Sequence, residues 1–232
     1  MISTILIEPE TPGNIGAIAR SMKNFDLKNL ILINPKCGHL DKEALDRATH
    51  AKEILKNAII KDFPYLKEFD YLIATTSQLG TDYNIPRSPI TPEQLAEKLA
   101  KINLKELNVG ILIGREGIGL KNKEILMSDF VVTIPSSKAY PTLNAAHAAT
   151  IVFYEIFKKI GKEKVNEHII PATKIEKEII LKKLDNILDK MEFTTKEKKE
   201  TQRKIWKRIV GKSFLTRREA FALIGFLKKI EK

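Results

Sequence analysis

Three short segments of this 232-residue chain combine glycines with amide, carboxylate and guanidinium side chains. The first, residues 12–20, contains Asn14, Gly16 and Arg20. Asn14 is a favourable helix N-cap, Gly16 allows another backbone to come close, and Arg20 would lie on the following helix. A guanidinium held near the strand ends would lie where open α/β sheets bind ligands. An ordinary turn with a surface arginine explains the same residues equally well.

The second segment has three glycines in six residues, Gly114, Gly117 and Gly119, with Glu116 between them. Such a loop bends sharply and offers bare backbone N–H and C=O groups to a ligand. Because the Glu116 carboxylate would repel phosphate, the loop favours a ligand with positive character. The alternative is a glycine-rich turn that binds nothing.

The third segment, residues 134–148, begins as a polar loop with two prolines. A helix is then expected to open with Thr142 and Asn144 and to continue through small residues that permit close packing. Taken alone, the segment reads as a loop and a core helix. We interpret His147 as a packing residue and not as a catalyst.

The elements that must position these segments follow from the hydrophobic pattern. Five short runs rich in Ile, Leu and Val are typical of strands buried on both faces of a parallel sheet, at residues 4–7, 30–33, 71–74, 109–113 and 131–134. Helical patterns occur at residues 14–25, 41–57, 92–101, 121–127 and 142–159. This alternation predicts an α/β fold with a mostly parallel sheet, whose carboxyl strand ends are the usual place for a ligand.

The last third of the chain differs in pattern and in charge. Residues 161–172 read as a linker between a domain at 1–160 and an extension at 173–232, with helices expected at 173–190, 194–210 and 216–231. Thr194 with Glu197 and Thr216 with Glu219 have capping-box spacing. Residues 1–157 hold 18 basic and 18 acidic side chains, so residues 158–232 carry the whole net charge of +11. A basic extension suggests a nucleic-acid partner, and a solvated lysine-rich tail is the alternative.

Several function classes are excluded or disfavoured. The chain lacks the glycine fingerprint of dinucleotide-binding domains and a complete P-loop. One cysteine and four scattered histidines give no metal-ligand spacing, so we expect no metal. No apolar run is long enough to span a membrane, and the N-terminus does not resemble a secretory signal. The single cysteine fits a cytoplasmic location.

Taken together and in this order, the three segments resemble the motifs of the SPOUT class of RNA methyltransferases. The first has the form N-x-G-x-x-x-R, the second G-x-E-x-x-G-L, and the third a hydroxyl residue followed by L-N-x-x-x-A. The resemblance spans about residues 3–159. With its helical extension, the chain is similar to the TrmJ branch, which methylates ribose 2′-hydroxyls in the tRNA anticodon loop.

The resemblance implies an α/β-knot fold, in which a mostly parallel sheet ends in a trefoil knot and a small all-helical module follows. It implies S-adenosylmethionine as cofactor, held by Thr75, Thr76, Ser77, Gly114, Ile134, Pro141, Thr142 and Leu143. It implies a catalytic set of Asn14, Arg20, Glu116, Thr142 and Asn144. Because a guanidinium stays protonated, we expect Arg20 to clamp the target phosphate and stabilise the forming alkoxide, and not to act as a base.

The resemblance further implies a homodimer and a tRNA substrate, with cytidine at nucleotide 32 as the target. The residues expected to contact RNA are Arg20, Arg87, Arg203, Lys204, Lys207, Arg208, Arg217 and Arg218. The chain departs from the branch in two places: Gln78 replaces an arginine for which Arg87 could substitute, and Thr142 replaces the more usual serine. Two alternatives stay open, an enzyme of this class that acts on ribosomal RNA and a non-catalytic RNA-binding protein on the same scaffold.

Overall fold

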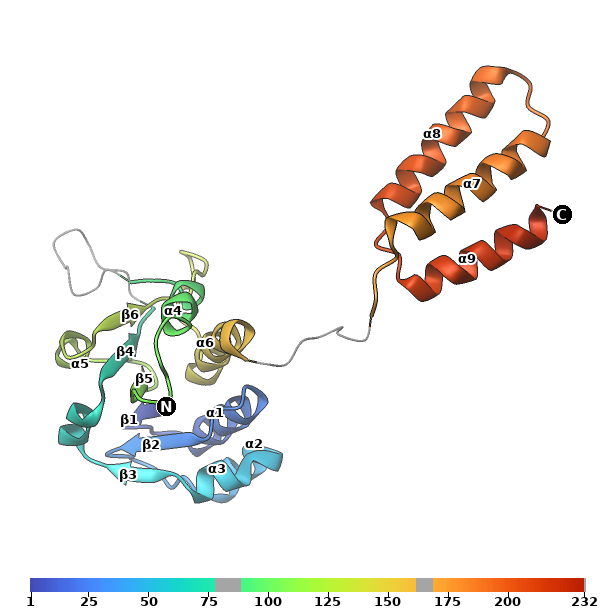
Figure 1. The fold of residues 1–232 in the computed structure, drawn as a ribbon. Coiled ribbons are helices and arrows are strands. Elements are labelled where there is room, and N and C mark those ends of the chain that lie inside the picture. Colours follow the sequence, from blue (N-terminus) through green and yellow to red (C-terminus); the bar gives the residue numbers. More distant parts are fainter. Residues whose placement is uncertain (78–88, 162–168, 232) are drawn as a thin grey trace. The chain divides into compact units, whose positions relative to one another are not determined.

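The computed structural model describes residues 1–77, 89–161 and 169–231 (Figure 1). The chain forms two compact units, Met1–Lys162 and Glu163–Lys232. Each unit has its own hydrophobic core. Among the described residues, no helix is both long and apolar enough to cross a membrane.

The N-terminal unit is built on a six-stranded sheet in the order β3-β2-β1-β5-β4-β6, and every neighbouring pair is parallel. The strands are β1 (Ile2–Ile7), β2 (Asn29–Ile33), β3 (Ile59–Lys61), β4 (Tyr71–Thr75), β5 (Val109–Ile113) and β6 (Phe130–Val132). The α/β class and the five predicted strands are confirmed. Because all strands run the same way, the segments that follow β1, β4, β5 and β6 emerge at one edge of the sheet.

The strand that the sequence analysis missed is β3. Its residues lie at the sheet edge and are all exposed, so no buried apolar run marks them. The last predicted strand also ends earlier than expected, at Val132 instead of position 134. The chain leaves the sheet there and enters the loop that carries the third motif.

Alternate side chains of the central strands pack on opposite faces of the sheet. One face is covered by α1 (Pro12–Asn24), α2 (Lys42–Ala48), α3 (Lys52–Lys56), α4 (Pro92–Leu99) and α6 (Ala145–Ile160). The other face packs against η2 (Phe63–Glu68) and α5 (Asn122–Leu126). In α1, Gly16 lies against the carbonyl of Ala44, where a Cβ would come within 2.2 Å of the oxygen. The predicted close backbone approach at Gly16 is therefore confirmed.

Two predicted helix starts were wrong, and both corrections matter for the site. Helix α1 begins at Pro12 with Thr11 as its N-cap residue, so Asn14 lies inside the first turn. Proline favours the first helical position, which moves the start ahead of Asn14. Helix α6 begins at Ala145, and Asn144 is its N-cap, because the Asn144 side chain accepts a hydrogen bond from the Ala146 N–H. Thr142 therefore belongs to the preceding loop.

The predicted helix over residues 41–57 is interrupted. Thr49 has φ of 49° and ψ of −106°, a conformation that no helix accommodates, and a 3-10 turn η1 (Thr49–Ala51) separates α2 from α3. Threonine is β-branched and seldom adopts positive φ, so sequence periodicity gave no sign of this break.

The C-terminal unit consists of α7 (Lys174–Lys190), α8 (Lys196–Lys212) and α9 (Arg217–Ile230). Its core includes Ile180, Leu184, Val210 and Leu227. The capping box of Thr216 and Glu219 is confirmed. The one predicted at position 194 is wrong, because the neighbouring Thr195 hydroxyl caps α8 instead. Backbone hydrogen bonds join residues 170–172, the end of the predicted linker, to residues 215–217 of this unit.

Candidate active site

The three motifs meet at the carboxyl edge of the sheet through a chain of hydrogen bonds. Asn144 Nδ2 donates to Asn14 Oδ1 over 3.1 Å, and Asn14 Nδ2 donates to Glu116 Oε1 over the same distance. Asn14 is 102 positions from Glu116 and 130 from Asn144 in the sequence, so the fold alone brings it to these partners. The convergence that the motif resemblance predicts is observed for these three side chains.

The direction of every bond in this chain is fixed. A carboxylate only accepts hydrogen bonds, so Asn14 must turn its NH2 group toward Glu116 and its oxygen toward Asn144. Asn144 in turn must donate, because its own oxygen accepts the Ala146 N–H at 2.8 Å. The two amides are therefore held in one orientation each.

Glu116 also fixes the segment that joins β1 to α1. Its Oε2 accepts the backbone N–H of Glu10 at 3.0 Å, and its Oε1 accepts that of Thr11 at 3.3 Å. With Asn14, three donors converge on this carboxylate. Glu116 thus joins the glycine loop of the second motif to the start of α1. This structural contact explains why the loop contains a carboxylate, a group that would repel a bound phosphate.

The glycine loop after β5 folds back on itself. Arg115 and Gly119 exchange backbone hydrogen bonds of 3.2 and 3.0 Å. Gly117 and Gly119 have φ of 81° and 68°, values that L side chains rarely adopt. A Cβ on Gly114 would lie 2.4 Å from the backbone of Gly119 and Leu120, so this position must also be glycine for the loop to close.

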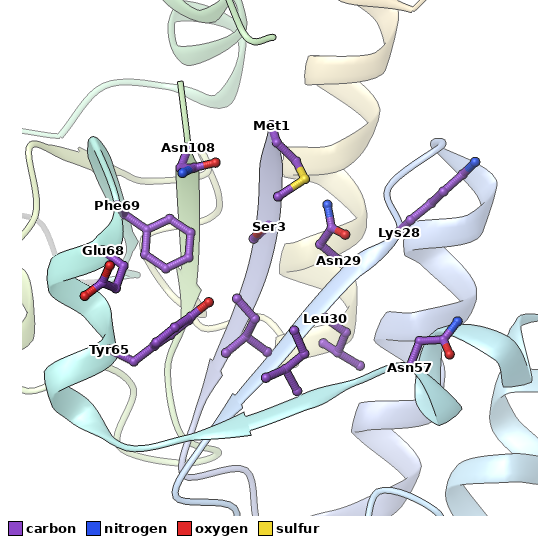
Figure 2. Close-up of a pocket in the computed structure, with 12 residues that line it drawn as sticks. Met1, Ser3, Lys28, Asn29, Leu30, Asn57, Tyr65, Glu68, Phe69 and Asn108 are labelled. Atoms are coloured by element: carbon purple, nitrogen blue, oxygen red, sulfur yellow. The ribbon is translucent and has the colours of Figure 1, made fainter. Parts of the chain in front are cut away.

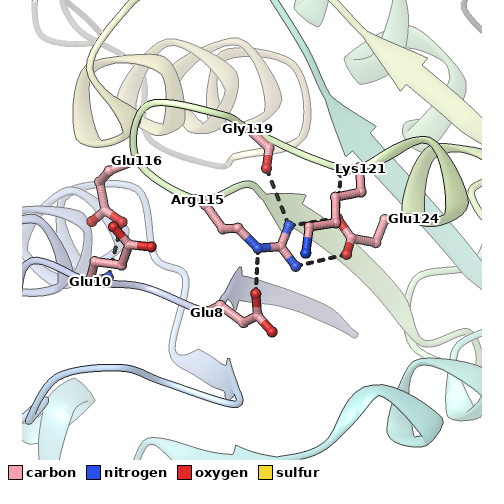
Figure 3. A network of polar contacts seen from close by, with 7 residues as sticks. All are labelled: Glu8, Glu10, Arg115, Glu116, Gly119, Lys121 and Glu124. Carbon is pink, nitrogen blue, oxygen red and sulfur yellow. Dashed lines mark hydrogen bonds and ion pairs between the residues drawn. The ribbon is translucent and has the colours of Figure 1, made fainter.

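A buried ion-pair network, which was not predicted from the sequence, joins this loop to Glu8 and to α5 (Figure 3). Arg115 forms a bidentate pair with Glu124 at 2.8 and 2.9 Å and donates through Nε to Glu8 at 2.5 Å. The Arg115 side chain is 2% exposed and that of Glu124 is fully buried. Lys121 N–H also donates to Glu124, and Arg115 Nη1 donates to the Gly119 carbonyl.

These contacts shift the ionisation of the groups involved. The hydrogen bond from Arg115 lowers the pKa of Glu8 below its usual value. The hydrogen bonds to Glu124, and then to Glu8, raise the pKa of Arg115. The arginine is therefore permanently charged, and it joins the end of β1, the glycine loop and α5. One sequence signal could have indicated this network. Arg115 is a charged residue within the glycine loop, and the acidic Glu124 follows nine positions later.

The loops expected to hold the cofactor also lie side by side. Thr133 Oγ1 donates to the carbonyl of Thr76, and the hydroxyls of Ser77 and Thr142 are 3.4 Å apart. Thr75 Oγ1 donates to the carbonyl of Leu112 in the neighbouring strand. The segment after β4 is thus joined both to β5 and to the loop after β6.

The part of the site expected to hold S-adenosylmethionine has the groups that such a ligand needs. In the described chain, the backbone groups of Ile134, Thr142 and Leu143 take part in no hydrogen bond, so they are available to a nucleoside edge. Pro141 and Thr142 are exposed, and the carbonyl of Pro141 accepts a bond from Ser136. The Glu116 carboxylate beside the glycine loop suits a cationic sulfonium. These residues fit the expected cofactor.

Arg20 is not part of this hydrogen-bonded cluster. It is exposed on α1 and makes no hydrogen bond or ion pair with any residue that the structure describes. Six residues of helix place it about 9 Å along the axis from Asn14. The next residue, Ser21, shares a 2.6 Å hydrogen bond with Thr150 of α6. The motif predicted a guanidinium held at the strand ends. Instead, the Arg20 side chain is exposed and unpaired among the described residues.

The residues expected to bind RNA fall into three groups. Arg203 is engaged by Asp185, Asp189 and Glu200, and Arg217 by Glu176. Among the residues expected to bind RNA, four of the C-terminal unit are exposed and form no ion pair within the described chain: Lys204, Lys207, Arg208 and Arg218. Arg87 lies outside the described residues. His147, interpreted from the sequence as a packing residue, is instead exposed on α6, while its neighbour Ala146 faces inward.

A cavity of the N-terminal unit lies at the opposite edge of the sheet (Figure 2). It has a volume of about 390 Å³, and Met1, Asn29, Tyr65, Phe69 and Asn108 are among its lining residues. None of the motif residues lines it. A cavity of about 10 Å³, room for a single water, lies among Asn14, Gly114 and Glu116. We place the site at the motifs, because their polar side chains converge there.

Comparison with known proteins agrees with this geometry. The model of the SpoU rRNA Methylase family matches residues 1–154. The tRNA (cytidine-2′-O-)-methyltransferase TrmJ of Methanocaldococcus jannaschii is 38% identical over 231 residues, which are 98% of this chain and 99% of that protein. The match therefore includes the C-terminal unit.

Two solved structures share the fold. The crystal structure of TrmJ from Z. mobilis ZM4 superposes with a TM-score of 0.73 at 29% identity and covers all of both chains. The SpoU methyltransferase AviRb from Streptomyces viridochromogenes, in complex with AdoMet, gives a TM-score of 0.53 at 21% identity over 70% of this chain and 58% of that one.

The resemblance, the fold class and the enzymatic activity that the motifs predicted are confirmed at the level of the family. SpoU methyltransferases bind S-adenosylmethionine, so the predicted cofactor is confirmed at the same level. The trefoil knot and the roles of individual site residues stay predictions. The motifs joined at the strand ends and the family match over residues 1–154 show that this protein is a methyltransferase of the SpoU family.

Proposed function

We propose that the protein methylates the ribose 2′-hydroxyl of a nucleotide in the tRNA anticodon loop, with cytidine 32 as the target. The observation that carries the proposal is the hydrogen-bonded chain from Asn144 through Asn14 to Glu116, which joins all three motifs. The choice of tRNA is supported by the similarity to the M. jannaschii tRNA methyltransferase along the whole chain, including the basic C-terminal unit.

Bound S-adenosylmethionine supplies a methyl group that is already activated for transfer. The protein must then align the ribose oxygen with that group and favour loss of the hydroxyl proton. Cofactor contacts come from the backbone of Gly114, Ile134, Pro141 and Leu143, with hydroxyls from the segments after β4 and β6. The residues with hydroxyl groups are Thr75, Thr76, Ser77 and Thr142.

The fixed amides of Asn14 and Asn144 orient the substrate side of the site, and Glu116 holds them in place. Arg20 carries a permanent charge on an exposed helix surface, where it clamps a phosphate beside the target ribose and stabilises the alkoxide as it forms. A guanidinium that stays protonated cannot take up the proton, so the proton leaves to solvent or to a phosphate oxygen.

The enzyme acts as a homodimer in this proposal. On α6, Val152 and Phe153 are fully buried within their own chain, whereas Ile151 and Tyr154 are 36% and 49% exposed. These two apolar side chains, on a helix that packs against α1, offer a surface for a second copy. Sedimentation of the full chain tests this point, because a monomer at micromolar concentration would contradict it.

Transfer of labelled methyl groups from S-adenosylmethionine tests the proposed reaction. We expect label in purified tRNA and none in ribosomal RNA from the same cells. Label in ribosomal RNA alone would favour the second reading, an enzyme for that substrate, to which the description of the matched family refers. The Asn14→Ala variant serves as the control, because it breaks the hydrogen-bonded chain without removing a charge.

A further inference from the structure

The ring of Phe214 is fully exposed, although the turn that carries it is firmly held. Its relative exposure is 102%, the highest among the large apolar residues that the structure describes. Ser213 N–H donates to Ile209 at 3.0 Å, and the carbonyl of Leu215 accepts the N–H of Ala172 at 2.7 Å. Lys177 Nζ donates to the carbonyl of Ser213. The backbone on both sides of Phe214 is therefore fixed, and the ring points to solvent from an ordered turn.

The surroundings of this ring are strongly basic. Residues 201–218 contain seven basic side chains and no carboxylate. They are Arg203, Lys204, Lys207, Arg208, Lys212, Arg217 and Arg218. Lys212 and Arg218 lie two residues before and four residues after Phe214, are exposed, and form no ion pair within the described residues. Arg217 is held by Glu176 at 2.8 Å, with its guanidinium 5.6 Å from the ring centroid of Phe221.

An exposed ring between free cations suits one kind of partner. A nucleobase has an apolar face that stacks on an aromatic ring, and its phosphates bring the negative charge that the flanking cations need. A base within a duplex is already stacked on both faces, so the ring selects an unpaired base. An acidic protein would satisfy the cations but would leave the phenyl ring without a planar counterpart.

We propose that Phe214 is a stacking site for an unpaired nucleobase of bound RNA, with Lys212 and Arg218 holding the phosphates beside it. This inference rests on the proposed function, because the RNA in question is the tRNA substrate. It adds a specific contact to the general attraction of a basic surface. It also predicts that the C-terminal unit binds an RNA loop more tightly than a helical stem.

The test measures RNA binding by the full chain and its variants. The probes are a tRNA transcript, an unstructured uridine-rich oligonucleotide and an RNA duplex of equal length. Phe214→Ala should weaken binding of the tRNA and the oligonucleotide by about 5- to 150-fold, the range that loss of one base–aromatic stack gives. Duplex affinity and the salt dependence of binding should not change, because no charge is lost.

Two further variants separate stacking from a general effect of substitution. Phe214→Trp should restore or tighten binding, because the larger ring also stacks. Phe226→Ala is the matched control, since Phe226 is 61% exposed on α9 but lies outside the carboxylate-free run, and it should change affinity less than twofold. Each variant should keep the wild-type melting temperature, because both rings are exposed.

Three outcomes would overturn the inference. They are unchanged binding by Phe214→Ala, an equal loss with Phe226→Ala or with the duplex, and a lower sedimentation coefficient for Phe214→Ala than for the wild type, which would show that a second copy covers Phe214. Failure of the proposed function is a separate result. A wild-type protein that methylates no tRNA but binds the oligonucleotide through Phe214 would refute the proposed reaction and leave the stacking site standing.

Discussion

Replacing Arg115 with methionine should destabilise the N-terminal unit more than any single surface substitution. The change leaves the fully buried Glu124 carboxylate without its bidentate partner. Removing one member of a buried pair costs about 3–5 kcal/mol, because the remaining charge is uncompensated. Glu124 would keep its bond from the Lys121 N–H, and Glu8 is 19% exposed and can be hydrated. We therefore expect the lower part of that range, about 3 kcal/mol.

Thermal unfolding of the full chain measures this loss. For a unit of this size, about 1 kcal/mol corresponds to roughly 2–4 °C, so the transition of the N-terminal unit should fall by about 6–12 °C. Lys121→Met is the matched control. It removes a positive charge from the same loop, but its side chain is exposed and its backbone N–H remains, so the shift should stay within about 2 °C.

A double variant distinguishes an unpaired charge from lost packing. Arg115→Met combined with Glu124→Leu removes both charges, and such replacements are often neutral or stabilising. Much of the lost stability should therefore return. The reasoning is refuted if the single variant melts within 2 °C of wild type, or if the double variant is less stable than the single one.

Three further predictions concern the site, the C-terminal unit and pH. Arg20→Ala should lower turnover by about 100-fold or more, the usual effect of losing a transition-state donor, while S-adenosylmethionine affinity measured by calorimetry stays within twofold; near-normal methylation would rule out the clamp role. Deleting residues 163–232 should leave cofactor binding intact but weaken tRNA binding and flatten its salt dependence in filter-binding assays; unchanged tRNA affinity would contradict this division of labour. Glu8→Gln should reduce stability at pH 7, because the lowered pKa of Glu8 means that its charged form stabilises the fold above its ordinary value of 4.5. In melting curves from pH 7 to pH 3, this advantage of the wild type should shrink as pH falls through the lowered pKa, and an advantage that grew toward pH 3 would exclude the assignment.

Much of the fold could be predicted from local sequence. Buried strands such as β1 and β5 are uninterrupted apolar runs, and the helix predicted from residue 92 begins there, after a capping box of Thr91 and Gln94. The elements that were missed depend on context. An exposed edge strand such as β3 has no buried pattern to detect, and the break at Thr49 reflects a backbone conformation that its residue type does not favour.

The site shows the same division. Motif spacing correctly placed Asn14, Glu116 and Asn144 at strand ends, because parallel strands bring their carboxyl ends to one edge. The spacing did not reveal that Glu116 accepts two backbone hydrogen bonds from the segment between β1 and α1, besides the one from Asn14. It also did not reveal the partners of Arg115. Those contacts depend on side-chain directions across the sheet, which a single sequence does not contain.

Mapping of 2′-O-methyl groups at nucleotide resolution tests the central claim most directly. Unmodified tRNA would be incubated with the full chain and S-adenosylmethionine, with the Asn14→Ala variant run in parallel. The account predicts one new mark, on the ribose of cytidine 32 in the anticodon loop, and its loss in the variant. A mark elsewhere in the tRNA would contradict the assigned position, and an unmodified tRNA would contradict the proposed reaction itself.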